Sequence, residues 1–185
     1  MSASDILTRL RTALESAGVA YMITGSFASS AHGTPRATQD VDVVIAPTRE
    51  QLLALLQQFP ESEYYSSEQD ALQALHYRSQ FNVIDQHSIW KIDFIVRKER
   101  AFSQEEFRRR TQIDIAGVRL YAATPEDILL VKLEWAKVGE SERQINDAAG
   151  IIRVQGTNLD LPYVERWVSA LGLEQQWDSA RRKAP

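Results

Sequence analysis

Two aspartates, Asp40 and Asp42, stand two residues apart in the run of β-branched apolar residues that covers positions 40–45. This run predicts a strand, and side chains two residues apart in a strand point to the same face. The two carboxylates would then lie side by side, with Cα atoms about 6–7 Å apart. At an effective dielectric constant of about 20, their repulsion is on the order of 2–3 kcal/mol. A divalent cation that takes both carboxylates as ligands would remove this cost.

A third carboxylate, Asp93, interrupts a second apolar β-rich run at residues 90–96. If this strand neighbours the strand of Asp40, three carboxylates converge on one point. Together with the oxygens of a nucleoside triphosphate, they would hold one or two Mg²⁺ (or Mn²⁺) ions. An exposed position on an edge strand is the alternative reading of Asp93.

Gly25 and Ser26 stand where an apolar strand, residues 19–24, meets the start of a predicted helix. A glycine lets a phosphate approach the backbone closely, and a helix N-terminus offers free N–H groups and a partial positive charge. The Ser26 hydroxyl adds a hydrogen-bond donor. The alternative is a plain helix start in which Ser26 is only the N-cap. The aspartate pair that follows favours a phosphate site.

Gly25-Ser26, a gap of 13 residues and Asp40-Val41-Asp42-Val43 together resemble the signature of the DNA polymerase β-type nucleotidyltransferases. Residues 33–40 resemble the bacterial branch that includes AbiEii-like abortive-infection toxins and antibiotic nucleotidyltransferases. The similarity covers roughly residues 19–150. Its specific part is the glycine-serine and aspartate motif, whereas the likeness in the helical part is less specific.

The resemblance implies a metal-dependent enzyme that moves a nucleoside monophosphate from an NTP to an acceptor hydroxyl and releases pyrophosphate. Asp40 and Asp42 would hold both metal ions, while Asp93 would bind the second one and help to activate the attacking oxygen. The acceptor stays open between RNA such as tRNA, a protein and a small molecule. One form of this prediction is a toxin-type enzyme with a cognate antitoxin. The alternative is a non-catalytic module of the same fold that binds a protein partner, as an antitoxin or regulatory domain would.

Three further residues are predicted to contact the nucleotide. Arg36 suits phosphate oxygens through its planar guanidinium, with a solvated loop arginine as the alternative of equal weight. Thr38 follows Arg36 by two residues and precedes Asp40 by two residues. Lys132 interrupts the apolar run 128–133. It either reaches the triphosphate or packs its aliphatic stem on the helix while its ammonium reaches water.

The periodicity of apolar residues predicts an α+β fold with a small mixed β-sheet nucleotidyltransferase core flanked by helices. We expect this core to cover residues 1–123 and a helical C-terminal region, 124–185, to pack on it. The charged segment 97–110 is predicted to be a surface helix. The remaining predicted elements of the core are helices at 4–17, 25–32, from 48 onward and 67–77, strands at 19–24 and 40–46, and hairpins at 81–96 and 113–121.

The composition sets bounds on function. The chain has 185 residues, no cysteine and a formal net charge of −4. The lack of cysteine excludes disulfides, thiolate zinc sites and cysteine nucleophiles. The negative charge argues against non-specific binding of nucleic acid through overall charge. Because no apolar stretch reaches the roughly 18 residues of a membrane span and no signal peptide is evident, we expect a cytoplasmic protein without membrane contact.

Overall fold

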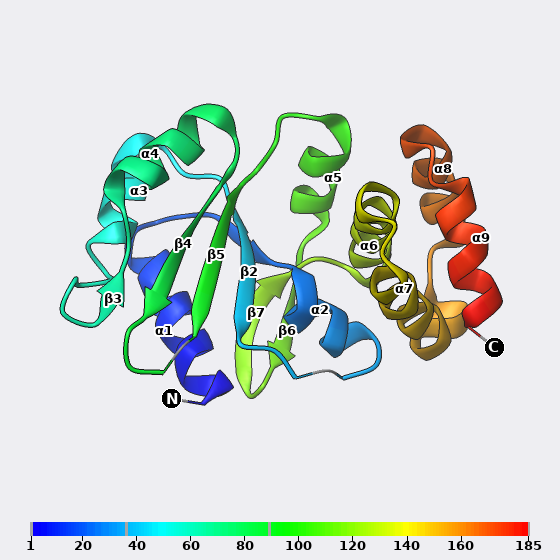
Figure 1. The fold of residues 1–185 in the computed structure, drawn as a ribbon, viewed down its shortest axis with the longest axis horizontal. Helices are drawn as coiled ribbons and strands as arrows, with labels where there is room; N and C mark the ends of the chain where they lie inside the picture. The colour runs from blue at the N-terminus through cyan, green and yellow to red at the C-terminus, as the bar shows by residue number, and fades with distance from the viewer. Residues whose placement is uncertain (1, 36, 89, 185) are drawn as a thin grey trace. The chain divides into compact units, whose positions relative to one another are not determined.

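The computed structural model of this chain describes residues 2–35, 37–88 and 90–184 and separates into two compact units (Figure 1). The core unit comprises Met1–Phe27 and Ala37–Ala122, and the helical unit comprises Ala28–Arg36 and Ala123–Pro185. The predicted α+β class is confirmed, since the core unit combines a mixed β-sheet with helices. The short segment 28–36 groups with the helical unit, although it precedes most of the core unit in the sequence.

The core unit is built on one mixed sheet, with strand order β3-β4-β5-β2-β1-β7-β6 in the described part of the chain. Its strands are β1 (Tyr21–Ile23), β2 (Asp40–Ile45), β3 (Tyr64–Tyr65), β4 (Gln80–Asp85), β5 (Lys91–Val96), β6 (Thr111–Ile115) and β7 (Val118–Ala122). β2 pairs in parallel with β5 and β1 pairs in parallel with β7, while the other neighbours are antiparallel. The central place of β2 agrees with its four apolar residues, Val41, Val43, Val44 and Ile45, all of which are buried.

Helices α1 (Ala3–Ser16), α3 (Arg49–Leu56), α4 (Glu68–Tyr77) and α5 (Ala101–Arg109) belong to the core unit, and α2 (Gly25–His32) begins there. Two of them start with a capping box, in which the N-cap side chain accepts from the backbone N–H of the third helical residue and the side chain of that residue accepts from the N-cap N–H. In α1 the Ser2 hydroxyl accepts from Asp5 N, and in α3 the Thr48 hydroxyl accepts from Gln51 N, both at 3.2 Å. These caps fix where the helices begin.

The central strands show their two faces plainly in their burial. One face is apolar and covered by α4, with Phe94 stacked against Phe81 at 5.1 Å between ring centroids and in contact with Phe59 at 6.0 Å. The fully or almost fully buried residues of this face are Val41, Val43, Ile45, Ile92, Phe94 and Val96. Because side chains alternate along a strand, the residues between them point to the opposite face. That opposite face carries the predicted carboxylates.

The charged segment before β6 differs from its prediction as a surface helix. The helix is shorter, Ala101–Arg109, and it buries Phe102 and Phe107. The guanidinium groups of Arg97 and Arg110 lie over the Phe107 ring, at 5.6 and 4.3 Å from its centroid. Charged side chains therefore cover apolar ones here, with cation–π contacts adding to the packing. The many charged residues of this segment led to the prediction of an exposed helix, although Phe102 and Phe107 give it a buried face.

The helical unit contains α6 (Pro125–Gly139), α7 (Glu142–Gln155), α8 (Leu161–Leu171) and α9 (Glu174–Lys183). The predicted start of α6 is confirmed: Thr124 caps it and Pro125 occupies its first turn. The fully buried Asp127 accepts hydrogen bonds from the Thr124 hydroxyl at 2.7 Å and from the Tyr163 hydroxyl at 2.5 Å. Asp127 thus ties α6 to α8. Within the described ranges, no helix has the length and apolar character that crossing a bilayer requires.

Lys132 of α6 forms a buried ion pair with α7. Its Nζ donates to Oδ2 of Asp147 at 2.8 Å, and the two side chains are only 6% and 17% exposed. The pair satisfies a charge that would otherwise be costly in this apolar setting.

We therefore expect Asp147→Ala to destabilise the helical unit by about 3–5 kcal/mol, because it leaves the Lys132 ammonium buried without its partner. Urea unfolding followed by circular dichroism measures this loss. The matched control is Asp178→Ala on the exposed surface of α9, which we expect to stay within about 0.5 kcal/mol of the parent. Equal unfolding midpoints for the two variants would show that the buried pair contributes little.

Candidate active site

The parallel pairing of β2 with β5 places Asp42 directly opposite Asp93 and Asp40 opposite Lys91. Register partners on neighbouring strands share a face, and residues two apart along a strand do so too. Asp40, Asp42 and Asp93 therefore occupy one face of the sheet. Asp93 is buried with 7% of its surface exposed, whereas Asp42 is half-buried and Asp40 is exposed.

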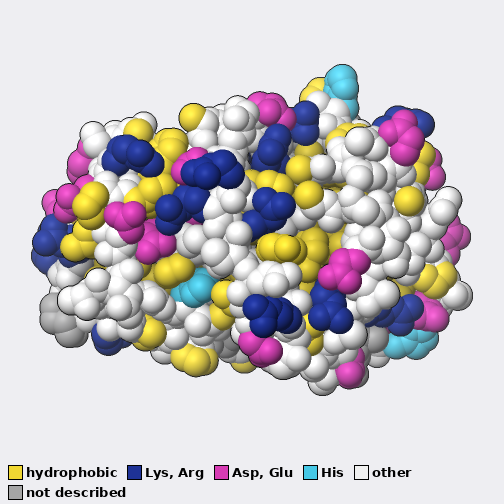
Figure 2. All heavy atoms as spheres, turned by 180° about the vertical axis from the view of Figure 1, so that it is seen from behind, with side chains coloured by type: hydrophobic (Ala, Val, Ile, Leu, Met, Phe, Trp, Pro, Cys, Tyr) yellow, Lys and Arg dark blue, Asp and Glu magenta, His cyan; other side chains and the backbone are white. Residues whose placement is uncertain are grey.

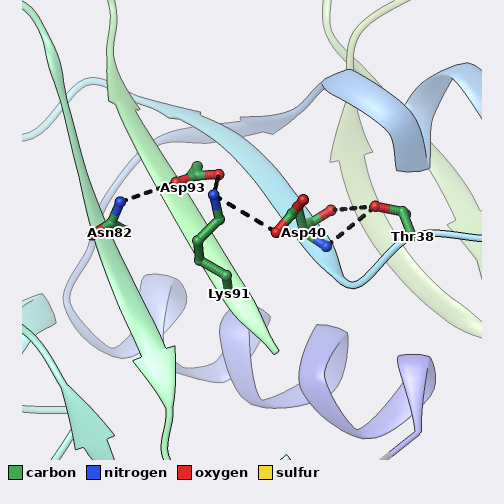
Figure 3. A network of polar contacts seen from close by, with 5 residues as sticks. All are labelled: Thr38, Asp40, Asn82, Lys91 and Asp93. Atoms are coloured by element: carbon green, nitrogen blue, oxygen red, sulfur yellow. Dashed lines mark hydrogen bonds and ion pairs between the residues drawn. The ribbon is translucent and has the colours of Figure 1, made fainter. Parts of the chain in front are cut away.

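Lys91 lies among these carboxylates, and no role was predicted for it from the sequence. Its Nζ is 2.9 Å from Oδ2 of Asp93 and 3.7 Å from Oδ1 of Asp40 (Figure 3). The hydrogen bond to Asp93 is the main reason that the pKa of Lys91 is raised, and the charges of Asp93, Asp40 and Asp42 raise it further against some desolvation. The signal was available, because Lys91 precedes Asp93 by two residues, the same spacing that pairs Asp40 with Asp42.

Asn82 is a second neighbour that the sequence did not single out. It is the register partner of Asp93 on the other side, in β4, and its amide Nδ2 donates to Oδ1 of Asp93 at 3.5 Å (Figure 3). The two oxygens of Asp93 thus have different partners, an ammonium on one and an amide on the other. This arrangement offsets part of the cost of burying a carboxylate.

Gly25 lies against the carboxylate of Asp42. The backbone N–H of Thr24 donates to the Asp42 carbonyl at 2.9 Å, which extends the pairing of β1 with β2 up to the start of α2. A Cβ added to Gly25 would stand 1.9 Å from Oδ2 of Asp42, and the φ of Gly25 is +61°. Only glycine combines this conformation with this approach. As a result, the N-terminus of α2, where Ser26 is the second residue, begins beside a carboxylate of the site.

The other predicted nucleotide contacts lie in different surroundings. The Thr38 hydroxyl accepts from Asp40 N at 3.2 Å and donates to Asp40 O at 3.3 Å, so it shapes the turn that leads into β2. Arg36 lies outside the described residues. Lys132 belongs to the helical unit and pairs with Asp147. A triphosphate contact of Thr38, Arg36 or Lys132 stays a prediction.

The carboxylate face suits a divalent cation by its chemistry. Its donors are carboxylate oxygens, the ligands that Mg²⁺ and Mn²⁺ prefer, and a cation, the Lys91 ammonium, already lies between two of them. Within residues 2–35, 37–88 and 90–184, no group of three or more His, Cys, Asp or Glu side chains is arranged as a complete metal-ligand set. The three carboxylates share a face, but they do not converge on a single point in this structure.

Solved structures with a similar fold are nucleotidyltransferases. The antibiotic-resistance factor ANT(2'')-Ia superposes with a TM-score of 0.61 at 14% identity, over 98% of this chain and 97% of that one. The lincosamide antibiotic adenylyltransferase LnuA gives 0.55 at 11% identity, over 82% of this chain and 98% of its own. A nucleotidyltransferase-like protein from Paracoccidioides brasiliensis gives 0.51 at 22% identity, over 82% and 76%. This chain has the nucleotidyltransferase fold.

At these identities the likeness establishes the fold alone, and this fold agrees with the one that the sequence predicted. No protein-family model matches the sequence, and no curated protein matches it. The assignment to an AbiEii-like branch stays a prediction. On the nucleotidyltransferase fold, chemistry has to be argued from the residues of the site itself.

The helical unit contains a hollow of about 350 Å³, lined by residues of both charges that include Asp147, Arg153 and Lys183. It lies wholly within that unit, whereas the carboxylates belong to the core unit.

The contact of Gly25 with Asp42 can be tested by comparing two glycines with positive φ. Gly117, in the turn after β6, has a φ of +79° and open space where a Cβ would stand, whereas a Cβ on Gly25 would meet Asp42. We expect Gly117→Ala to lose about 1–2 kcal/mol of unfolding free energy from backbone strain alone. Gly25→Ala should lose about 1–3 kcal/mol more, because Asp42 must move. Urea unfolding of both variants measures the difference, and equal losses would contradict the steric contact.

Proposed function

We propose that this chain is a metal-dependent nucleotidyltransferase that moves a nucleoside monophosphate from an NTP to an acceptor hydroxyl and releases pyrophosphate. One observation supports this proposal above the others. Asp42 and Asp93 face each other on neighbouring parallel strands, beside a glycine at which a helix begins, and this arrangement occurs on the nucleotidyltransferase fold.

Each residue of the site has a role in this proposal. Asp40, Asp42 and Asp93 would hold Mg²⁺ or Mn²⁺, which when bound supplies charge neutralisation at the phosphate oxygens. Gly25 and the first turn of α2, with Ser26, would donate N–H groups to the phosphates. The oxygen of the acceptor hydroxyl would attack the α-phosphorus while the bond from that phosphorus to pyrophosphate breaks. Asp93 would accept the proton that this hydroxyl loses. Positioning and charge neutralisation account for most of such catalysis.

We propose a small molecule with a free hydroxyl as the first acceptor class to test. A structure of ANT(2'')-Ia in complex with adenylyl-2''-tobramycin matches 94% of this chain and 97% of its own length. LnuA has been solved with lincomycin bound. RNA is the second class, in which a toxin-type enzyme would fall. Figure 2 shows Lys and Arg side chains at several places on one face with Asp and Glu between them, and the net charge is −4. The net negative charge favours a compact acceptor over a long polyanion.

The function is tested with Asp42→Asn, which keeps the shape of the side chain and removes its charge. We expect label transfer from an α-³²P-labelled NTP to fall by about a hundredfold or more, because the cation loses Asp42, one of its three proposed carboxylate ligands. The assay uses each of the four NTPs with Mg²⁺ or Mn²⁺ and three acceptor pools: aminoglycosides and lincosamides, total tRNA, and cell-extract protein. Asp70→Asn, at an exposed position of α4, is the matched control and should retain full activity.

A measurement of ligand-induced stabilisation, combined with the transfer assay, separates the enzyme from a non-catalytic partner-binding module. An NTP with Mg²⁺ at about 100 times its Kd should stabilise the parent protein by about 2.7 kcal/mol. Absence of both this stabilisation and any metal-dependent label transfer would contradict the proposal and favour the non-catalytic alternative.

A further inference from the structure

Lys91 supplies a positive charge at the centre of a face that otherwise gathers carboxylates. We propose that its ammonium is a built-in counter-ion that holds the cation position between Asp40 and Asp93 in the metal-free protein, and that a divalent cation must displace it to bind Asp93. This inference rests on the proposed function, because it concerns the cation that the same carboxylates would hold. It makes Lys91 a determinant of metal affinity.

The geometry of Asp93 supports this competition. Asp93 is the most buried of the three carboxylates, and each of its oxygens already has a partner: Oδ2 accepts from Lys91 at 2.9 Å and Oδ1 accepts from Asn82 at 3.5 Å. The shorter and charged contact is the one to Lys91 (Figure 3). A cation that approaches the Oδ2 side of Asp93 therefore meets an ammonium at hydrogen-bonding distance from the same oxygen. Like charges this close repel strongly, so the two do not share the position.

The side chain of Lys91 can leave. It is 35% exposed, so the ammonium has solvent to move into, and its four-carbon stem has several rotatable bonds. Its second contact, to Asp40, is 3.7 Å long and involves an exposed carboxylate, so it holds the ammonium only weakly. The strand itself stays in place, because Ile92 and Phe94 on either side of Asp93 are buried on the opposite face.

Two measurable consequences follow, one for the metal-free protein and one for the protein with a divalent cation bound. Without Lys91, the metal-free protein keeps three carboxylates on one face with no ammonium among them, so it should be less stable than the parent. With a divalent cation bound, the missing ammonium no longer competes, so the cation should bind more tightly. The two effects have opposite signs, and a residue that only supports the fold would produce the first without the second.

The test is Lys91→Met in the full-length chain, which keeps the length of the stem and removes the charge. After treatment with EDTA and buffer exchange, Mn²⁺ alone is titrated and its binding is followed by electron paramagnetic resonance and calorimetry. We expect the Kd for Mn²⁺ to fall by about tenfold, a typical coupling between two competing ligands. We also expect a lower Tm than the parent in EDTA, with the difference closed by saturating Mn²⁺.

Three variants complete the design. Lys91→Arg keeps the charge and should bind Mn²⁺ with a Kd close to that of the parent. Lys98→Met removes an exposed lysine just beyond β5 and should change neither Kd nor Tm. Lys91→Gln keeps a donor for Asp93 without the charge and undergoes the same titration, so the test stands even where the methionine variant does not fold without metal.

The outcomes distinguish this inference from the proposed function. Unchanged or weaker Mn²⁺ binding by Lys91→Met and Lys91→Gln, with the parent binding Mn²⁺, would overturn the counter-ion role and leave the proposed enzyme intact. Failure of Mn²⁺ to bind any variant or the parent would overturn both. Tighter binding in the uncharged variants, with Lys91→Arg unchanged, is the result that the structure predicts.

Discussion

The pairing register between β2 and β5 determines which side chains meet on the carboxylate face. It puts Asp42 opposite Asp93 and, two residues earlier, Asp40 opposite Lys91. A shift of one residue in either strand would turn its polar side chains into the apolar layer and its apolar ones to the other face. The buried Val41, Val43 and Phe94 prevent that shift, since each would have to leave the core. Hydrophobic packing on one face therefore sets the polar chemistry on the other.

Placing carboxylates together has a cost, and the local structure offsets it at each of them in a different way. Asp93 has the ammonium of Lys91 and the amide of Asn82. Asp42 lies beside the N-terminus of α2, whose partial positive charge favours an anion, and the missing side chain of Gly25 makes that closeness possible. Asp40 is exposed, so water screens it. The face thus gathers negative charge, and in the proposed function a divalent cation would take the place of the Lys91 ammonium beside it.

Local patterns in the sequence predicted part of the geometry of this face. The two-residue spacing of Asp40 and Asp42 predicted their common face, and Gly25 was predicted at the start of a helix, but its contact with Asp42 was not predicted. The pairing of β2 with β5 could only be assumed from the sequence. It joins strands that are about 50 residues apart, and no local pattern encodes such a pairing. Lys132 illustrates the same limit, since its partner Asp147 lies on another helix. Lys91 was missed although it precedes Asp93 by two residues, because a charged lysine cannot ligate a cation and so did not fit the pattern of metal-binding carboxylates.

The likeness to ANT(2'')-Ia and LnuA spans most of this chain at 14% and 11% identity, so the fold has been retained while most side chains differ. What such a fold shares is the geometry of a strand pair and a helix start. In the proposed function, this geometry would hold a triphosphate and a cation whatever molecule bears the attacking hydroxyl. The acceptor would then be selected by side chains outside the carboxylate face, which can differ between proteins of one fold. The chemistry of the carboxylate face can therefore be tested before its acceptor is known.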